Sequence, residues 1–213
     1  MTTARDLLIV ALDVPSARDV GQGDLSLALA GAEVLDLLEV QALTLREDSL
    51  VPSAERVTDD RLLDEAQTRL VRQEPYETVE DWLWRRGRGL ASAYADALEK
   101  EGESGGKRRH RLPWRSERTA PADSPARRHA TDRWNAHEPV LVGLAAALGI
   151  QDAPPAERTD SEAAERGDSD TTVDPDALEA VLAAVGDALT ELEAVRQRRR
   201  IEEDAFDNVW RAP

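Results

Sequence analysis

The sequence has no cysteine, and aromatic residues make up only 4% of it. The absence of cysteine excludes disulfides and thiolate metal sites. Hydrophobic residues still account for 41% of the 213 residues, so a core can form, filled mainly by Leu, Val and Ala. Such a core suits packed helices better than a β-sandwich, and the length suits one domain. We therefore expect a mainly α fold.

Long hydrophobic runs are also absent. The run nearest the N-terminus, residues 7–12, stops at Asp13. It is too short for a signal-peptide core, and no other run approaches the roughly 20 apolar residues of a membrane span. The chain is therefore expected to be soluble and cytoplasmic.

Positive charge is scarce overall but concentrated in one region. The net charge is −16, and a field of that sign repels nucleic acid and anionic membranes unless the basic residues are segregated. Residues 85–133 hold 13 Lys and Arg against 7 Asp and Glu. We call this region the basic strip, and we expect it to contact an acidic partner.

The first part of the chain alternates helical patterns with one hairpin pattern. A short apolar helix begins near residue 5, and Asp24 is predicted to cap a second helix that ends near residue 40. The apolar stripe of this second helix leaves three acidic side chains on its opposite face: Glu33, Asp36 and Glu39. Two short alternating runs at residues 43–51 then predict a small β-hairpin.

The pattern after the hairpin is helical again. Residues 59–72 have helical spacing, and Thr78 is predicted to cap one long helix that reaches Lys100, with Asp81 at the capping-box position. Two shorter helices are expected at residues 122–136 and 140–148. Residues 5–150 thus predict a single domain, a helical bundle with one or two small β-hairpins.

The C-terminal part divides into three segments. Residues 151–173 contain seven acids, two prolines and no Leu, Ile or aromatic residue, which indicates a disordered acidic linker. Asp174 and Pro175 then predict the start of a helix at residues 174–200, which packs back on the domain through an apolar stripe. Residues 201–213 are expected to form a loose tail.

No pattern of catalysis or metal binding is found. The histidines, His110, His129 and His137, do not have the spacing of a helical metal site. Gly106 and Lys107 lack the other residues of a phosphate-binding loop, and residues 102–106 (GESGG) are expected to form a flexible turn after a helix rather than the strand-to-helix turn of a nucleophile elbow. We therefore expect no catalytic residue, metal site or cofactor.

Two groups of residues in the basic strip are candidates for binding. On a wheel of the helix at residues 78–100, Arg85, Arg88 and Ser92 share the outer side and Trp84 lies at their border. Arginine matches phosphate oxygens with paired hydrogen bonds, and tryptophan favours the lipid interface. This group is either a phosphate site or a solvated helix face.

The second group is a loop or hairpin at residues 107–115. Its cations surround two apolar side chains that can enter lipid headgroups. The residues concerned are Lys107, Arg108, Arg109, Arg111, Leu112, Trp114 and Arg115. The alternatives for this group are membrane contact, self-association and simple solvation.

The order of these features resembles the Golgi phosphoprotein 3 family, over roughly residues 5–200. The resemblance lies in residues 7–13 (LLIVALD), residues 27–37 (LALAGAEVLDL), the hairpin that follows them, and residues 97–102 (ALEKEG) with the basic stretch behind them. It implies an all-α domain with small hairpins that binds phosphatidylinositol 4-phosphate. It also implies capture of the cytoplasmic tails of membrane proteins and self-association through the hairpin. Bacterial-type members share the domain without a Golgi.

The family's headgroup pocket is largely not retained at the matching positions. A Trp and an Arg of the pocket match Gly21 and Ala30 here, and two later arginines match Arg88 and Ala91. Arg85 is a substitute for one of them. The resemblance therefore implies weaker and less specific binding of anionic headgroups.

We interpret the chain as a non-enzymatic cytoplasmic adaptor. Through the basic strip it binds anionic phospholipid headgroups, at the inner face of a membrane, or an acidic protein partner. The alternative is a scaffolding module that forms homo-oligomers through residues 107–115 without lipid. Nucleic-acid binding by a winged helix is disfavoured, because Glu33, Asp36 and Glu39 would face phosphate.

Overall fold

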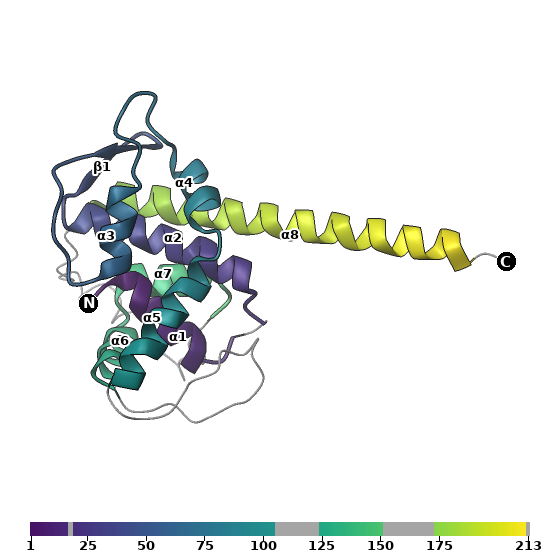
Figure 1. Cartoon of the computed structure of the whole chain (residues 1–213), viewed down its shortest axis with the longest axis horizontal. Helices are drawn as coiled ribbons and strands as arrows, with labels where there is room; N and C mark the ends of the chain where they lie inside the picture. The colour runs from purple at the N-terminus through teal and green to yellow at the C-terminus, as the bar shows by residue number, and fades with distance from the viewer. Residues whose placement is uncertain (17–18, 105–123, 151–172, 212–213) are drawn as a thin grey trace, which may run out of the picture.

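The computed structural model describes residues 1–16, 19–104, 124–150 and 173–211 (Figure 1). Helices dominate this part of the chain, and its one sheet is a two-stranded hairpin. The prediction of a mainly α fold with a small hairpin is therefore confirmed. The bounds of the elements are α1 Thr3–Asp13, α2 Gln22–Glu39, β1 Leu43–Arg46, β2 Ser49–Pro52, α3 Arg61–Thr68, α4 Val79–Arg86, α5 Leu90–Ser104, α6 Pro125–Asn135, α7 Pro139–Ala147 and α8 Pro175–Arg211.

Helix α2 is the centre of the domain. It contacts α1, α3, α4, α5, α7 and α8, and every residue from 25 to 37 is buried. A helix that packs on all sides must be apolar nearly all round, which the leucines and alanines of α2 provide. The predicted exposure of Glu33 and Asp36 is wrong, since they are 0% and 4% exposed. Only Glu39, at the end of the helix, is exposed as expected.

The start of α2 also differs from the prediction. The N-cap is Gly21, which offers no side-chain hydrogen bond, and the helix begins two residues before Asp24. Asp24 instead accepts hydrogen bonds of 2.7 and 2.8 Å from Nη1 of Arg196. The carboxylate that was expected to cap α2 therefore joins the first turn of α2 to α8.

The predicted hairpin is confirmed. Strands β1 and β2 are antiparallel, with Leu45 opposite Leu50. The N–H of Leu50 donates to the carbonyl of Glu77, and the N–H of Val79 donates to the carbonyl of Asp48. These bonds join the hairpin to the start of α4.

The long helix predicted at residues 78–100 is two helices. Thr78 caps α4 as expected, accepting from the N–H of Asp81 at 3.1 Å. The helix then ends at Arg86, and α5 begins at Leu90. Gly89, in the turn between them, has a φ of +74°, a conformation that glycine adopts without strain. Side chains before and after this turn therefore do not follow one helical wheel.

Three other helices are close to their predicted positions. Helix α3 is shorter than residues 59–72 and is capped by Asp60, which accepts from the N–H groups of Leu62 and Leu63. Helix α6 begins at Pro125 after the N-cap Ser124. Helix α7 ends just before Gly149, as predicted. The 107–115 loop and nearly all of the predicted 151–173 linker lie outside the described residues; Val173 is described and is buried.

Helix α8 packs on the domain with its first half and projects from it with its second half (Figure 1). The predicted apolar stripe is confirmed, since Val181, Val185 and Leu189 are buried against the core. The helix does not end at residue 200, however, and continues to Arg211. The expected loose tail contains no glycine or proline before Pro213 and is rich in helix-forming residues, so the helix can propagate through it.

Candidate functional site

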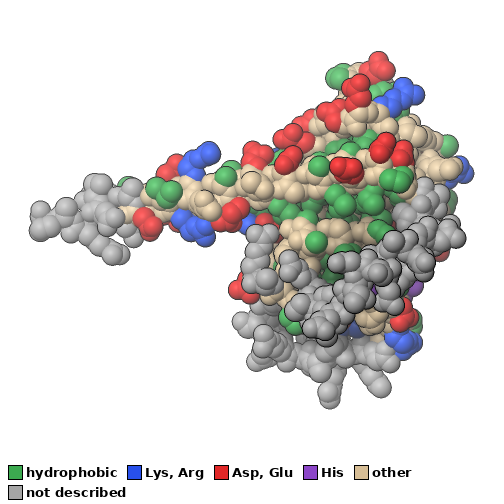
Figure 2. Space-filling model, turned by 180° about the vertical axis from the view of Figure 1, so that it is seen from behind, with side chains coloured by type: hydrophobic (Ala, Val, Ile, Leu, Met, Phe, Trp, Pro, Cys, Tyr) green, Lys and Arg blue, Asp and Glu red, His purple; other side chains and the backbone are tan. Residues whose placement is uncertain are grey.

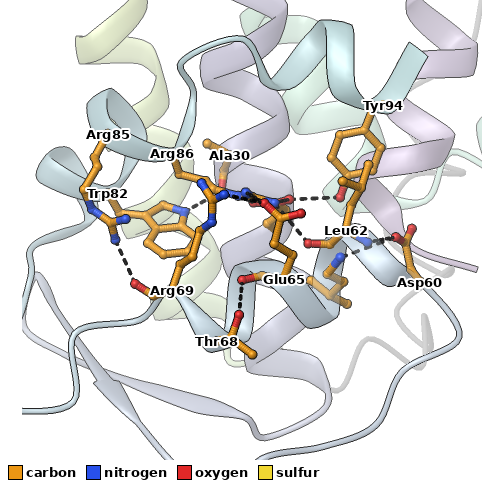
Figure 3. A network of polar contacts seen from close by, with 12 residues as sticks. Ala30, Asp60, Leu62, Glu65, Thr68, Arg69, Trp82, Arg85, Arg86 and Tyr94 are labelled. Carbon is orange, nitrogen blue, oxygen red and sulfur yellow. Dashed lines mark hydrogen bonds and ion pairs between the residues drawn. The ribbon is translucent and has the colours of Figure 1, made fainter. Parts of the chain in front are cut away.

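An ion pair between α2 and α4 is buried inside the domain. The Nε and Nη2 atoms of Arg86 donate to the two carboxylate oxygens of Glu33, both at 2.8 Å (Figure 3). The side chains are 3% and 0% exposed. Arg86 also donates to the carbonyl of Leu62 and to the carboxylate of Glu65.

Tyr94 of α5 completes this network. Its hydroxyl donates to Oε1 of Glu33 at 3.1 Å. Burial raises the pKa of Glu33 to about 7, although the hydrogen bonds and charge of Arg86 act in the opposite direction. Burial also raises the pKa of Tyr94 well above its usual value. The network joins four helices, and its central Arg86 and Glu33 side chains are almost fully buried, so we assign it a structural role.

Asp36 caps a helix other than its own. Its carboxylate accepts from the backbone N–H groups of Thr3 at 2.8 Å and Ala4 at 3.1 Å. These groups lie in the first turn of α1, whose N-cap Thr2 makes no side-chain cap bond. Burial raises the pKa of Asp36 to about 6. The Asp36 carboxylate, at the centre of the domain, therefore accepts hydrogen bonds from N–H groups in the first turn of α1, which have no partner within that helix.

The basic residues of α6 bind carboxylates of the domain. Both carboxylate oxygens of Asp13 accept from Nη1 of Arg127 at 2.8 Å. Arg133 donates to Asp6 at 2.8 Å and to Glu138 at 2.9 Å. Nδ1 of His129 lies 3.1 Å from the buried Asp6 carboxylate. The described end of the basic strip therefore does not form a free cationic surface.

Arg85 is also bound within the domain. Its Nε and Nη2 donate to the Glu77 carboxylate at 2.6 Å each. Its Nη2 also donates to the carbonyl of Arg69 at 3.1 Å (Figure 3). Its guanidinium lies 5.1 Å from the Trp82 ring centroid. The hydrogen bonds to Glu77 raise the pKa of Arg85. The positive charge of Arg85 is therefore largely neutralised by the Glu77 carboxylate.

Arg88 differs from the arginines around it. It is exposed, and within the described residues it makes no hydrogen bond or ion pair. It lies in the turn between α4 and α5 and lines a shallow surface hollow together with Trp84, Gln22, Gly23 and Leu192. We call this feature the Arg88 hollow. Its walls come from α2, α4 and α8 and from the turn.

The first turn of α2 forms one wall of the Arg88 hollow. A helix N-terminus carries a partial positive charge and free N–H groups, and the N-cap Gly21 has no side chain to satisfy them. The Gln22 amide donates to Oγ of Ser92 at 2.6 Å, at the edge of the hollow. The nearby Asp24 carboxylate is already paired with Arg196. The positive end of α2 and the guanidinium of Arg88 together favour the binding of an anion in the hollow.

The structure therefore brings Arg88 and Trp84 together, places Ser92 beside them through Gln22, and separates Arg85 from all three. Arg85 is held by Glu77 instead, and the turn between α4 and α5 takes Arg88 and Ser92 off the helical wheel of α4. Ala30 and Ala91, which we expected to match pocket residues of the family, are both fully buried. The contributions of Gln22 and Leu192 were missed, because no local pattern shows that α8 packs beside the first turn of α2.

The same described residues offer neither a metal-binding cluster nor a membrane span. They contain no cluster of three or more His, Asp or Glu side chains placed to hold a metal ion. Their helices do not combine the length and the hydropathy that a bilayer span requires.

Comparison with known proteins places the chain in a family. The model of the family described as Golgi phosphoprotein 3 (GPP34) matches residues 4–192, which covers the domain and the packed half of α8. No match to the chain is found among the curated proteins. The match extends over most of the sequence and agrees with the helical fold and with the hairpin at residues 43–52. The chain belongs to the Golgi phosphoprotein 3 family.

Proposed function

We propose that this protein is a non-enzymatic adaptor that binds phosphate-bearing lipid headgroups at a membrane surface through the Arg88 hollow. Membership of the Golgi phosphoprotein 3 family supports an adaptor in general. The observation that carries the lipid proposal is the state of Arg88, which is exposed and unpaired within the described residues beside Trp84 and the uncapped N-terminus of α2.

The chemistry of the Arg88 hollow suits a phosphate group. The guanidinium of Arg88 can donate two parallel hydrogen bonds to phosphate oxygens, and the N-terminus of α2 adds a favourable dipole. The half-buried Trp84 offers an amphipathic ring of the kind that lies at a lipid interface. The guanidinium, the ring and the N-terminus of α2 would then contact one headgroup together.

The proposed binding is weak and local. Arg85, Arg127 and Arg133 are paired with carboxylates, so they contribute little to an anion held at Arg88. One charge-assisted contact contributes about 1.5–3 kcal/mol, which alone gives low affinity. Binding therefore depends on a membrane that presents many headgroups at once, rather than on a single free headgroup.

Co-sedimentation with lipid vesicles tests the proposal. The full chain is mixed with vesicles of phosphatidylcholine alone, of phosphatidylcholine with phosphatidylserine, and of phosphatidylcholine with phosphatidylinositol 4-phosphate. We expect binding to the anionic vesicles only, and a decrease of at least tenfold in Arg88→Gln. Arg46→Gln removes the same charge from an exposed position on the hairpin and should bind normally.

Two results would remove the lipid proposal. One is the absence of binding to both anionic compositions at low salt, where electrostatic attraction is strongest. The other is equal binding by Arg88→Gln and the unmodified chain. If the chain does not bind anionic vesicles but binds an acidic protein segment, and this binding is lost in Arg88→Gln, the adaptor acts on a protein instead.

A further inference from the structure

The second half of α8 leaves the domain as a single helix (Figure 1). Arg196 is the last residue of α8 with a described ion pair to the domain, and residues 197–204 are all exposed. From residue 197 to 211 the helix extends about 22 Å. A helix of this length is marginally stable in water without a packing partner. The family match ends at residue 192, so this segment lies outside it.

The charges on this segment change sign at one residue. Three arginines at positions 198–200 precede Ile201, and three acids follow it at positions 202–204. Ile201 itself is 68% exposed. Figure 2 shows basic and acidic side chains close together on this part of the helix. Arg198 and Arg199 make no hydrogen bond or ion pair within the described residues, whereas Arg200 binds Glu193.

This order of charges is self-complementary in one orientation. A two-fold axis at Ile201 places the basic half of one helix beside the acidic half of an antiparallel second copy. Isoleucine then meets isoleucine at the axis. A parallel pair in register would instead place like charges together, which is unfavourable.

The face that carries Ile201 is free to accept a second helix. At 100° per residue, Ile201 shares a face with Ala183, Thr190 and Ala194, all of which are exposed. The stripe that packs on the domain, with Val181 and Val185, lies on the opposite face. A second helix can therefore run along α8 past residue 196 without colliding with the domain.

We infer that residues 198–204 of α8 form an antiparallel pair with the same residues of a second copy of this chain. We call the half of α8 that projects beyond residue 196 the arm. The two domains carry the same sign of net charge and repel each other, but the arms hold them apart. At about 0.15 M salt, charges more than about 8 Å apart are largely screened, while the close contacts between the arms are screened less. This surface is separate from both the Arg88 hollow and the 107–115 loop.

Two charge-reversed variants of the full chain test the inference by analytical ultracentrifugation at about 0.15 M salt. The acidic variant carries Arg198→Glu and Arg200→Glu, and the basic variant carries Glu202→Arg and Asp204→Arg. The unmodified chain should show a concentration-dependent dimer. Each variant alone should be monomeric, because like charges then meet across the axis. An equimolar mixture should form a heterodimer, and the chain with all four substitutions should dimerise again.

A matched control distinguishes the effect of charges on the arm from the effect of the net charge of the whole chain. Arg46→Glu with Arg61→Glu changes the charge as much as the acidic variant, at exposed positions on the hairpin and α3, and should keep the dimer. Circular dichroism checks that every variant is folded. A monomeric unmodified chain at all concentrations, a dimer of either arm variant alone, or a mixture that stays monomeric would each overturn the inference.

Discussion

The guanidinium of Arg86 binds the carboxylate of Glu33 through two parallel hydrogen bonds of 2.8 Å inside the domain. The pair links the last turn of α4 to the middle of α2, and its other polar atoms are satisfied by Leu62, Glu65 and Tyr94. A buried charge is stable only when its partner is present. The two residues therefore depend on each other.

Replacing one member of this pair should cost more than replacing both. Arg86→Met leaves the Glu33 carboxylate buried without its partner, and we expect a loss of about 3–5 kcal/mol in the free energy of unfolding. Glu33→Leu together with Arg86→Met removes both charges and should recover a large part of that loss. Urea unfolding followed by circular dichroism measures both. Equal losses in the single and double variants would show that the ion pair itself contributes little.

The sequence predicts much of the fold, because its helices and hairpin follow local patterns. The Thr78 cap, the alternating runs at residues 43–51 and the stripe of α8 each depend on residues close together in the chain. The wrong prediction that Glu33 is exposed has a different origin. An acidic residue on a helix is usually solvated. Its burial here depends on Arg86, 53 positions away, which no local pattern identifies.

The candidate site was predicted only in part, for a related reason. Arg88 and Trp84 were expected to lie together and do, but the helical wheel also placed Arg85 with them, because the glycine turn between α4 and α5 was not foreseen. The signal for the turn was present in the sequence as Gly87 and Gly89. The pairing of Arg85 with Glu77 depends on the path of the chain before α4, which no periodicity fixes.

The cap that Asp36 provides to α1 should make stability depend on pH. Burial raises the pKa of Asp36 to about 6, above the value near 4 of an unfolded chain. The folded state therefore binds a proton more tightly, and the stabilisation from this group is lost as pH rises from about 4 through 6. We expect the unfolding free energy of the unmodified chain, relative to Asp36→Asn, to fall over this range.

Urea unfolding at a series of pH values measures this difference. Glu80→Gln, at an exposed position of α4, serves as the control and should keep the pH dependence of the unmodified chain, because Glu80 is not among the charges that act on Asp36. A difference between the unmodified chain and Asp36→Asn that stays constant from pH 4 to 7, or that grows with pH, would contradict the assignment.

Alanine substitutions at two glycines should change the stability of the domain in opposite directions. A Cβ at Gly31 would collide with α8, whereas a Cβ at Gly186 would collide with nothing. A Cβ added at Gly31 would lie 2.5 Å from Cγ2 of Val185, in a buried contact between α2 and α8. Gly31→Ala should therefore destabilise the domain by about 1–3 kcal/mol. A Cβ at Gly186 on α8 meets nothing within 4 Å. Gly186→Ala should stabilise the domain by up to about 1 kcal/mol through helix propensity.

Thermal and urea unfolding measure both effects. Val185→Ala removes the methyl groups that a Cβ at Gly31 would strike, so the cost of Gly31→Ala should be smaller in that background than in the unmodified chain. If Gly31→Ala costs the same in both backgrounds, α8 does not pack on α2 through this contact. If α8 instead shifts as a whole, Gly31→Ala should also weaken the ion pair of Arg196 with Asp24, because that pair lies at the other end of the same interface.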